Sequence, residues 1–74
     1  MPYVSFNEKL FKNYIGIKVK GISYYLWFKT TEIKREDGRF SGVNGWGNSG
    51  ACTSIECDIT QIISIVYSEE LHYS

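Results

Sequence analysis

The clearest pattern along the chain is an alternation of apolar and polar positions with a period of two, which is typical of β-strands buried on one face. It first appears in IGIKV at residues 15–19, where the two isoleucines and the valine share a face. It returns in TSIECD at residues 53–58, where Ile55 and Cys57 are the inward positions. We therefore expect a half-buried strand in each of these segments.

Two other segments are apolar on both faces: the first half of SYYLWFKTTEI at 23–33, and IISIVY at 62–67. Tyr25 and Trp27 share one face of the first segment, and the other face carries Tyr24, Leu26 and Phe28. A single core covers only one face of a strand, so the second face of each segment needs another cover. We expect a homo-oligomer, a dimer or larger, to provide it.

Turn residues separate these segments. EDG at 36–38 predicts a two-residue hairpin turn, because Asp-Gly readily adopts the positive φ angles that such a turn requires. RFSGV at 39–43 is then the returning strand. Residues 44–52 are rich in glycine and asparagine and predict a long loop, and DIT at 58–60 predicts a tight turn.

The N-terminal segment carries a local helix signal. Ser5 and Glu8 have the spacing of a capping box, in which the serine caps the first turn and the glutamate bonds back to it. Leu10 and Phe11 would give such a helix a short apolar face. We expect a helix over residues 6–12.

These elements predict a mainly β protein, with a short N-terminal helix followed by about five antiparallel strands in one small domain over residues 1–74. The order of elements and the closing pattern SIECDITQIISI, a strand, a one-turn corner and a final short strand, resemble small Sm-like or SH3-like β-barrels. The resemblance covers about residues 5–67. It implies a small barrel or a strongly curved sheet.

The hexapeptide GWGNSG at residues 45–50 matches G-x-G-x-x-G. A dinucleotide fingerprint ends a strand and opens a helix, whose N-terminus faces the pyrophosphate. Here ACTSIECDI follows and alternates as a strand, and no Gly-Lys-Ser/Thr of a P-loop is present. The glycines therefore belong either to a plain mobile connection or to a binding loop of another kind.

Trp46 favours the binding loop, because a tryptophan among glycines either packs back on the protein or meets a partner. The backbone of the loop would form an anion-binding nest, and aromatic side chains near it would stack on a ring. The candidate ligand-binding residues are Asn44, Gly45, Trp46, Gly47, Asn48, Ser49, Tyr24, Tyr25, Arg35 and Arg39. Trp27 is a further aromatic candidate, and Lys18 and Lys20 are further phosphate partners; the alternative for each basic residue is plain solvent exposure. We expect Trp46 to carry function and the mid-strand Trp27 to carry stability.

Charge is balanced in total but segregated along the chain. Eight Lys and Arg balance eight Asp and Glu, and all the basic residues lie between Lys9 and Arg39. The balance argues against long nucleic acid as a partner, because tracking many phosphates needs a clear basic excess. The segregation favours solvated faces on interleaved strands, or one positive and one negative edge that would steer an anionic ligand.

Cysteine usage and hydropathy bear on compartment. Cys52 and Cys57 would lie on opposite faces of one strand, so we expect two free thiols in a reducing compartment, with Cys57 in the core. No apolar run approaches the ~20 residues of a membrane span. We therefore expect a cytoplasmic protein without a membrane partner. We also expect no metal or other cofactor, since the only histidine, a common metal ligand, is His72 near the chain end.

Catalytic signals are weak. A Ser-His-Asp arrangement would depend on His72, and Glu56 and Asp58, about 7 Å apart on one strand face, are typical of a solvated surface. We therefore expect a non-catalytic binding protein.

Two function classes remain open. One is capture of a small anionic, nucleotide-type ligand, and the other is a protein-binding inhibitor or adaptor of a host enzyme or defence complex. In size and composition the chain resembles small accessory proteins of bacteriophages, which implies an anti-defence role such as sequestering a host signal nucleotide.

Overall fold

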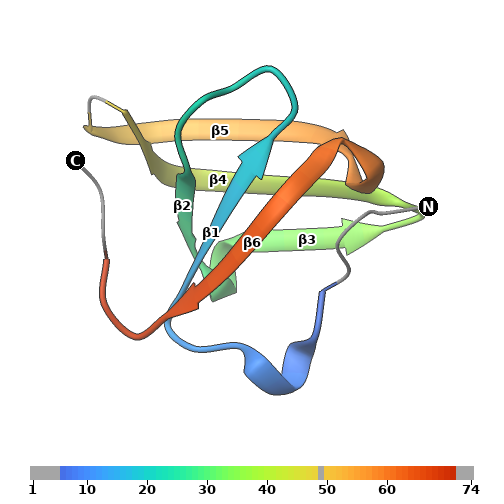
Figure 1. Ribbon diagram of the computed structural model, residues 1–74. Coiled ribbons are helices and arrows are strands. Elements are labelled where there is room, and N and C mark those ends of the chain that lie inside the picture. The colour runs from blue at the N-terminus through green and yellow to red at the C-terminus, as the bar shows by residue number, and fades with distance from the viewer. Residues whose placement is uncertain (1–5, 49, 72–74) are drawn as a thin grey trace.

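The computed structural model describes residues 6–48 and 50–71, and only the backbone of residues 51 and 52. The described residues form one curled antiparallel sheet, a half-barrel, with three short 3₁₀ turns (Figure 1). The strands are β1 (Tyr14–Val19), β2 (Leu26–Lys29), β3 (Ile33–Glu36), β4 (Arg39–Gly47), β5 (Gly50–Asp58) and β6 (Ile62–Ser68). The turns are η1 (Glu8–Leu10), η2 (Thr30–Glu32) and η3 (Ile59–Gln61). The expectation of a mainly β protein with a strongly curved sheet is confirmed.

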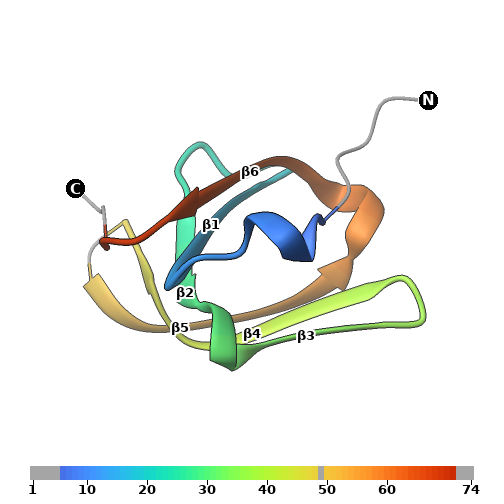
Figure 2. The ribbon, with the colours of Figure 1, turned by 90° about the horizontal axis from the view of Figure 1, so that it is seen from below.

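The segment expected as one strand at 23–33 is a bent strand, divided by η2 into β2 and β3. β2 pairs with β1 along its length and touches β4 only at Trp27 and Trp46, whereas β3 pairs with β4 alone. Both contact the same edge of β4, because its other edge is paired with β5. Counted together, β2 and β3 restore the expected number of about five strands. In Figure 2, β1 and β6 form one side of the half-barrel, β3, β4 and β5 form the other, and β2 joins them.

The core fills the space between the two sides of the half-barrel. The alternation at 15–19 is confirmed, since its isoleucines and valine are buried there. The other buried residues of the core are Leu26, Phe28, Phe40 and Ile62. Ile55 and Cys57 face inward as expected and pack against the core, although both are only half-buried.

The helix expected at 6–12 is wrong, because only the single turn η1 forms. Asn7 rather than Ser5 caps it, with its side-chain oxygen accepting from the Lys9 N–H at 3.0 Å, and Ser5 lies outside the described residues. Tertiary packing explains the difference. Phe6 stacks on Phe40 with 5.4 Å between ring centroids, and Phe11 lies 5.7 Å from the Tyr67 ring. Residues five positions apart point about 140° apart around an α-helix, so a helix would prevent both phenylalanines from reaching the sheet.

The hairpin turn at 36–38 is confirmed. Asp37 and Gly38 have φ angles of 54° and 75°, and Glu36 pairs with Arg39 across the turn. This is the geometry of a two-residue turn with both central residues at positive φ.

The long loop expected at 44–52 is wrong, because β4 and β5 continue until Gly47 pairs with Gly50. The glycines make room for a core ring. A Cβ at Gly42 would lie 2.8 Å from the Phe28 ring, and one at Gly45 would lie 2.4 Å from that ring and 2.6 Å from the Trp27 carbonyl oxygen. Asn44, with a φ of 56°, occupies the irregular position between them.

Gly45→Ala should therefore lower the free energy of unfolding by about 1–3 kcal/mol, the usual range for an overpacked core. Urea unfolding followed by tryptophan fluorescence measures the change. Val43→Ala, at an exposed position of the same strand, is the matched control and should shift the free energy by less than about 0.5 kcal/mol. A Gly45→Ala protein as stable as this control would contradict the packing of Phe28 against β4.

Candidate functional site

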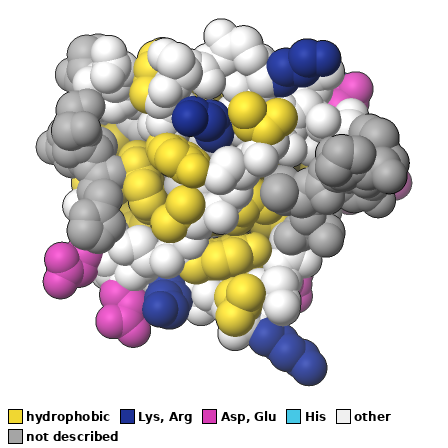
Figure 3. Space-filling model, in the orientation of Figure 1, with side chains coloured by type: hydrophobic (Ala, Val, Ile, Leu, Met, Phe, Trp, Pro, Cys, Tyr) yellow, Lys and Arg dark blue, Asp and Glu magenta, His cyan; other side chains and the backbone are white. Residues whose placement is uncertain are grey.

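Four aromatic side chains gather on the outer face of the sheet, opposite the core. We call Tyr14, Tyr25, Trp27 and Trp46 the aromatic face; they come from β1, the residue before β2, β2 itself and β4. Figure 3 shows hydrophobic side chains gathered over β1 and β2, with a basic side chain among them. These aromatic side chains cover the outer face of β2. The cover thus comes from the chain itself, whereas the sequence led us to expect it from a second subunit.

Trp27 is the base of the aromatic face. Gly16, its register partner on β1, has no side chain, and a Cβ there would lie 2.8 Å from the Trp27 ring. The ring therefore lies directly on the β1 backbone and is only 7% exposed. Val66, the partner of Gly16 on β6, is 37% exposed beside it.

Trp46 and Tyr14 form the half-buried outer layer. Trp46 is the register partner of Trp27, and its ring meets that of Tyr14 edge to face, with 6.0 Å between centroids. The ring centroids of Tyr25 and Trp27 are 6.1 Å apart. Each of the three outer rings is partly exposed, so the cluster presents aromatic surface to solvent.

Polar groups border the aromatic face at fixed positions. The Tyr25 and Ser64 hydroxyl oxygens are 2.6 Å apart, and the Lys18 ammonium lies 5.5 Å from the Tyr25 ring centroid, within cation–π range. At the other end, Lys29 pairs with Tyr14 in the strand register and is exposed. The outward positions of β1, β2 and β6 hold no Asp or Glu. These strand positions are therefore aromatic and basic, whereas the exposed Glu69 and Glu70 follow directly after β6.

A shallow depression adjoins the Lys29 end. It is lined by Asn13, Tyr14, Lys29, Thr30 and Thr31. The Thr30 hydroxyl is engaged there, donating to the Lys12 carbonyl oxygen at 2.9 Å, whereas Thr31 is exposed.

Of the expected residues, the structure places Trp46, Tyr25 and Trp27 on the aromatic face and Lys18 at its border. Tyr24 turns to the other side of the sheet and lies 3.7 Å from where a Cβ of Gly47 would be. Gly45 and Gly47 are buried within the sheet, Asn44 and Asn48 are exposed, and Ser49 lies outside the described residues. Trp46 belongs to strand β4 and not to a loop, and its backbone is paired with Trp27 on one side and Ala51 on the other.

Arg35 is engaged in holding the N-terminal segment. Its guanidinium group lies 5.1 Å from the Phe6 ring centroid and 5.3 Å from that of Phe11, and it forms an ion pair with Glu8. The Asn7 N–H also donates to the Tyr67 hydroxyl at 3.1 Å. These contacts fix residues 6–11 across one end of the half-barrel (Figure 2), which gives Arg35 a structural role.

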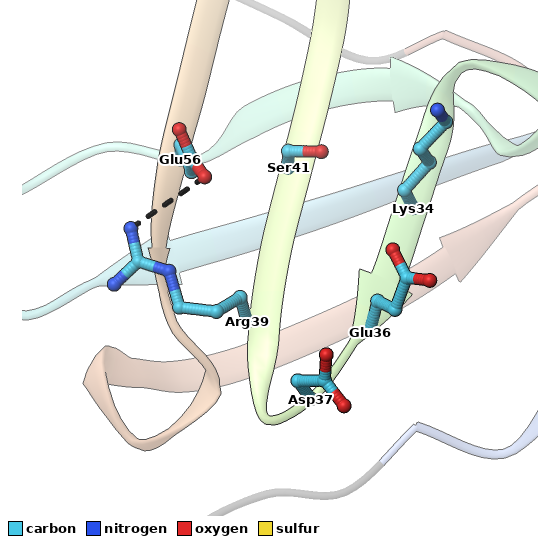
Figure 4. A pocket seen from close by; sticks show the side chains of 6 residues that line it. All are labelled: Lys34, Glu36, Asp37, Arg39, Ser41 and Glu56. Carbon is cyan, nitrogen blue, oxygen red and sulfur yellow. Dashed lines mark ion pairs between the residues drawn. The ribbon is translucent and has the colours of Figure 1, made fainter.

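Arg39 is neutralised by neighbouring carboxylates. It lies 2.8 Å from Asp58 and 3.7 Å from Glu56, and its hydrogen bond with Asp58 is the main cause of a raised pKa of the guanidinium group. Figure 4 shows Arg39 and Glu56 in the depression that they line with Lys34, Glu36, Asp37 and Ser41. Acidic and basic groups alternate there, so this surface offers little net attraction to an anion.

Sequence reasoning did not find Tyr14 and Lys29. The alternation that places Ile15 and Ile17 inward also places Tyr14, Gly16 and Lys18 outward, so the signal for Tyr14 was present. Lys20, another expected phosphate partner, is exposed beyond the end of β1.

The Cys57 thiol is free, and its pKa is raised above the ordinary value chiefly by burial, with the Arg39 charge opposing the shift. A raised pKa keeps the sulfur protonated, which makes it a poor nucleophile and metal ligand at neutral pH. The side chain of Cys52 lies outside the described residues.

No group of three or more His, Cys, Asp or Glu that could hold a metal ion occurs among the residues whose side chains the structure describes. No helix in the described part of the chain is long and apolar enough to cross a membrane.

No protein-family model matches the chain, and no curated protein or solved structure matches it either. The candidate site therefore rests on its own geometry.

The contact between Trp27 and Gly16 can be measured by a double-mutant cycle. Trp27→Ala should destabilise the protein by about 3 kcal/mol and Gly16→Ala by about 1 kcal/mol, because the new methyl group meets the indole ring. Once the ring is removed, Gly16→Ala should cost almost nothing, which gives a coupling energy of about 1 kcal/mol in urea unfolding. Strictly additive costs would show that the ring does not lie on Gly16.

Proposed function

We propose that this protein is a non-catalytic binding module that captures a small anionic ligand of the nucleotide type on its aromatic face. The observation that supports the proposal is the combination of half-exposed Trp46 and Tyr14 with Lys18 and Lys29, on strands without an outward carboxylate. The ring of the ligand stacks on the aromatic side chains, and its phosphate is neutralised by a lysine.

The contacts of this face suit recognition of a planar anion. Stacking of a base on an aromatic side chain contributes about 1–3 kcal/mol. The base of the site is rigid, because Trp27 lies on the β1 backbone and Tyr25 is held by Ser64. Pre-ordered side chains lose little entropy on binding, so a small face can contribute useful affinity.

The surroundings of Glu56 and Asp58, the two carboxylates considered as catalysts, support a non-catalytic role. Glu56 and Asp58 both face Arg39 on an exposed surface. Neither is held in an apolar pocket of the kind that tunes a general acid.

We retain the Sm-like or SH3-like barrel as the proposed fold family, supported by the bent β2–β3 strand and by the η3 corner before the last strand. A cytoplasmic phage-type protein that sequesters a host signal nucleotide remains the proposed biological role. It is supported by the size and composition of the chain together with the aromatic, basic face.

Titration with AMP, ATP and cyclic AMP, followed by tryptophan fluorescence, tests the binding proposal. We expect quenching of the fluorescence, and about a 10-fold loss of affinity for Trp46→Ala, equivalent to about 1.4 kcal/mol of stacking. Trp46→Phe keeps an aromatic ring and should retain most of the binding, while its thermal melting verifies the fold. Unchanged fluorescence at millimolar nucleotide, or full affinity in Trp46→Ala, would disprove the proposal.

The second candidate function is a protein-binding inhibitor or adaptor. It is favoured by the β6 edge strand, where Ile63 is 55% and Val66 37% exposed, because exposed edges and apolar positions are common docking elements. Native mass spectrometry of protein purified from a host lysate separates the two functions. A co-purified nucleotide supports the first, and one co-purified protein in defined stoichiometry supports the second.

The same β6 edge leads us to expect a homo-oligomer. Aromatic packing covers the outer face of β2 within the chain, which leaves Ile63 as the most exposed large apolar side chain described. Ile63→Lys should shift the protein toward monomer in sedimentation at micromolar concentration, whereas Val43→Lys, at a 47% exposed position on β4, should not. A wild-type protein that sediments as a clean 8.5 kDa monomer would overturn this expectation.

A further inference from the structure

The two lysines of the aromatic face lie at its opposite ends. Lys29 is level with Tyr14 in the strand register, and Lys18 is four residues further along β1. The rise of a strand places the two positions about 13 Å apart along the sheet. The aromatic rings lie between these two positive charges.

A single mononucleotide can contact only one of the two lysines through its phosphates. Its phosphates are contiguous, so they reach one lysine and leave the other without an anionic partner. Two cations at this separation, with aromatic surface between them, match phosphates separated by at least one nucleoside. Repeated phosphates joined by stackable rings are the chemistry of a single-stranded nucleic acid.

Building on the proposed function, we propose that the aromatic face binds a short single-stranded oligonucleotide. At least one base stacks on the partly exposed ring of Trp46 or on that of Tyr14, which stand at 71° to each other, and backbone phosphates lie at Lys18 and Lys29. The exposed Thr31, in the depression beside Lys29, supplies a hydroxyl donor for the phosphate at that end. Two cations suit a segment of a few nucleotides, which agrees with a chain of zero net charge.

Charge complementarity separates this occupant from a second copy of the chain. A symmetric dimer through the aromatic face would bring the lysines of both copies together, because the same patch meets itself. Like charges placed face to face disfavour such a contact. A duplex is also a poor fit, since its bases are stacked on each other and not available to the rings.

The test compares deoxythymidylates of one, two, four and six nucleotides, a duplex, and a hexaglutamate peptide, all measured by tryptophan quenching. We expect the tetranucleotide to bind at least 10-fold more tightly than the mononucleotide, with little further gain at six. The slope of log affinity against log salt should be about −1.4 for the tetranucleotide, because single strands give about −0.7 per neutralised phosphate.

Lys18→Gln and Lys29→Gln should each reduce that slope to about −0.7, while both variants keep the melting temperature of the wild type. Lys34→Gln, at an exposed position on β3, is the matched control and should leave the slope unchanged. Trp46→Ala should lose affinity for every length.

The outcomes distinguish this inference from the proposed function. Equal affinity for one and four nucleotides would overturn the oligonucleotide and leave nucleotide capture standing. Absence of binding to all nucleotides would overturn both. Equal or tighter binding of the duplex or of hexaglutamate would overturn the single-stranded occupant, and the peptide result would indicate an acidic protein partner instead.

Discussion

Two adjacent residues of β2 determine how this small sheet is built. Phe28 points into the half-barrel and needs glycines at 42 and 45 on β4, whereas Trp27 points outward and needs a glycine at 16 on β1. Each large ring thus lies against backbone that has no side chain in its way. Close approach of this kind increases contact area per residue, which matters in a chain of 74 residues with room for little core.

The outer ring packing has a consequence for function. In a larger protein a second layer of structure would cover β2, but here Trp27, Trp46 and Tyr25 provide the cover themselves. A cover made of aromatic side chains remains partly exposed at its outer surface, and aromatic surface is well suited to meeting a partner. The same residues therefore stabilise the sheet and form the candidate site. Trp27 is buried and contributes mainly to stability, whereas the half-buried Trp46 is available to a ligand.

The sequence correctly predicted the features that depend on local patterns of residues. Its predictions were wrong where contacts between residues distant in sequence determine the structure. The inward residues of β1 and β5 followed from the period of two, and the turn at Asp37 and Gly38 followed from its residue types. The glycines of β4 signalled a loop, because their partner, the Phe28 ring, is remote in sequence. For the same reason Arg35 seemed a ligand residue, although Phe6 and Phe11 enclose it.

Folding also changes the meaning of the charge segregation. Pairing β4 with β5 brings Asp58 and Glu56 of the acidic half to Arg39 of the basic half, so charges far apart in sequence neutralise each other. Lys18 and Lys29 lie instead on strands whose outward positions hold no acid. A chain of zero net charge can in this way present a local positive potential. Its partner is then selected by the charge of one face, which net charge alone would not reveal.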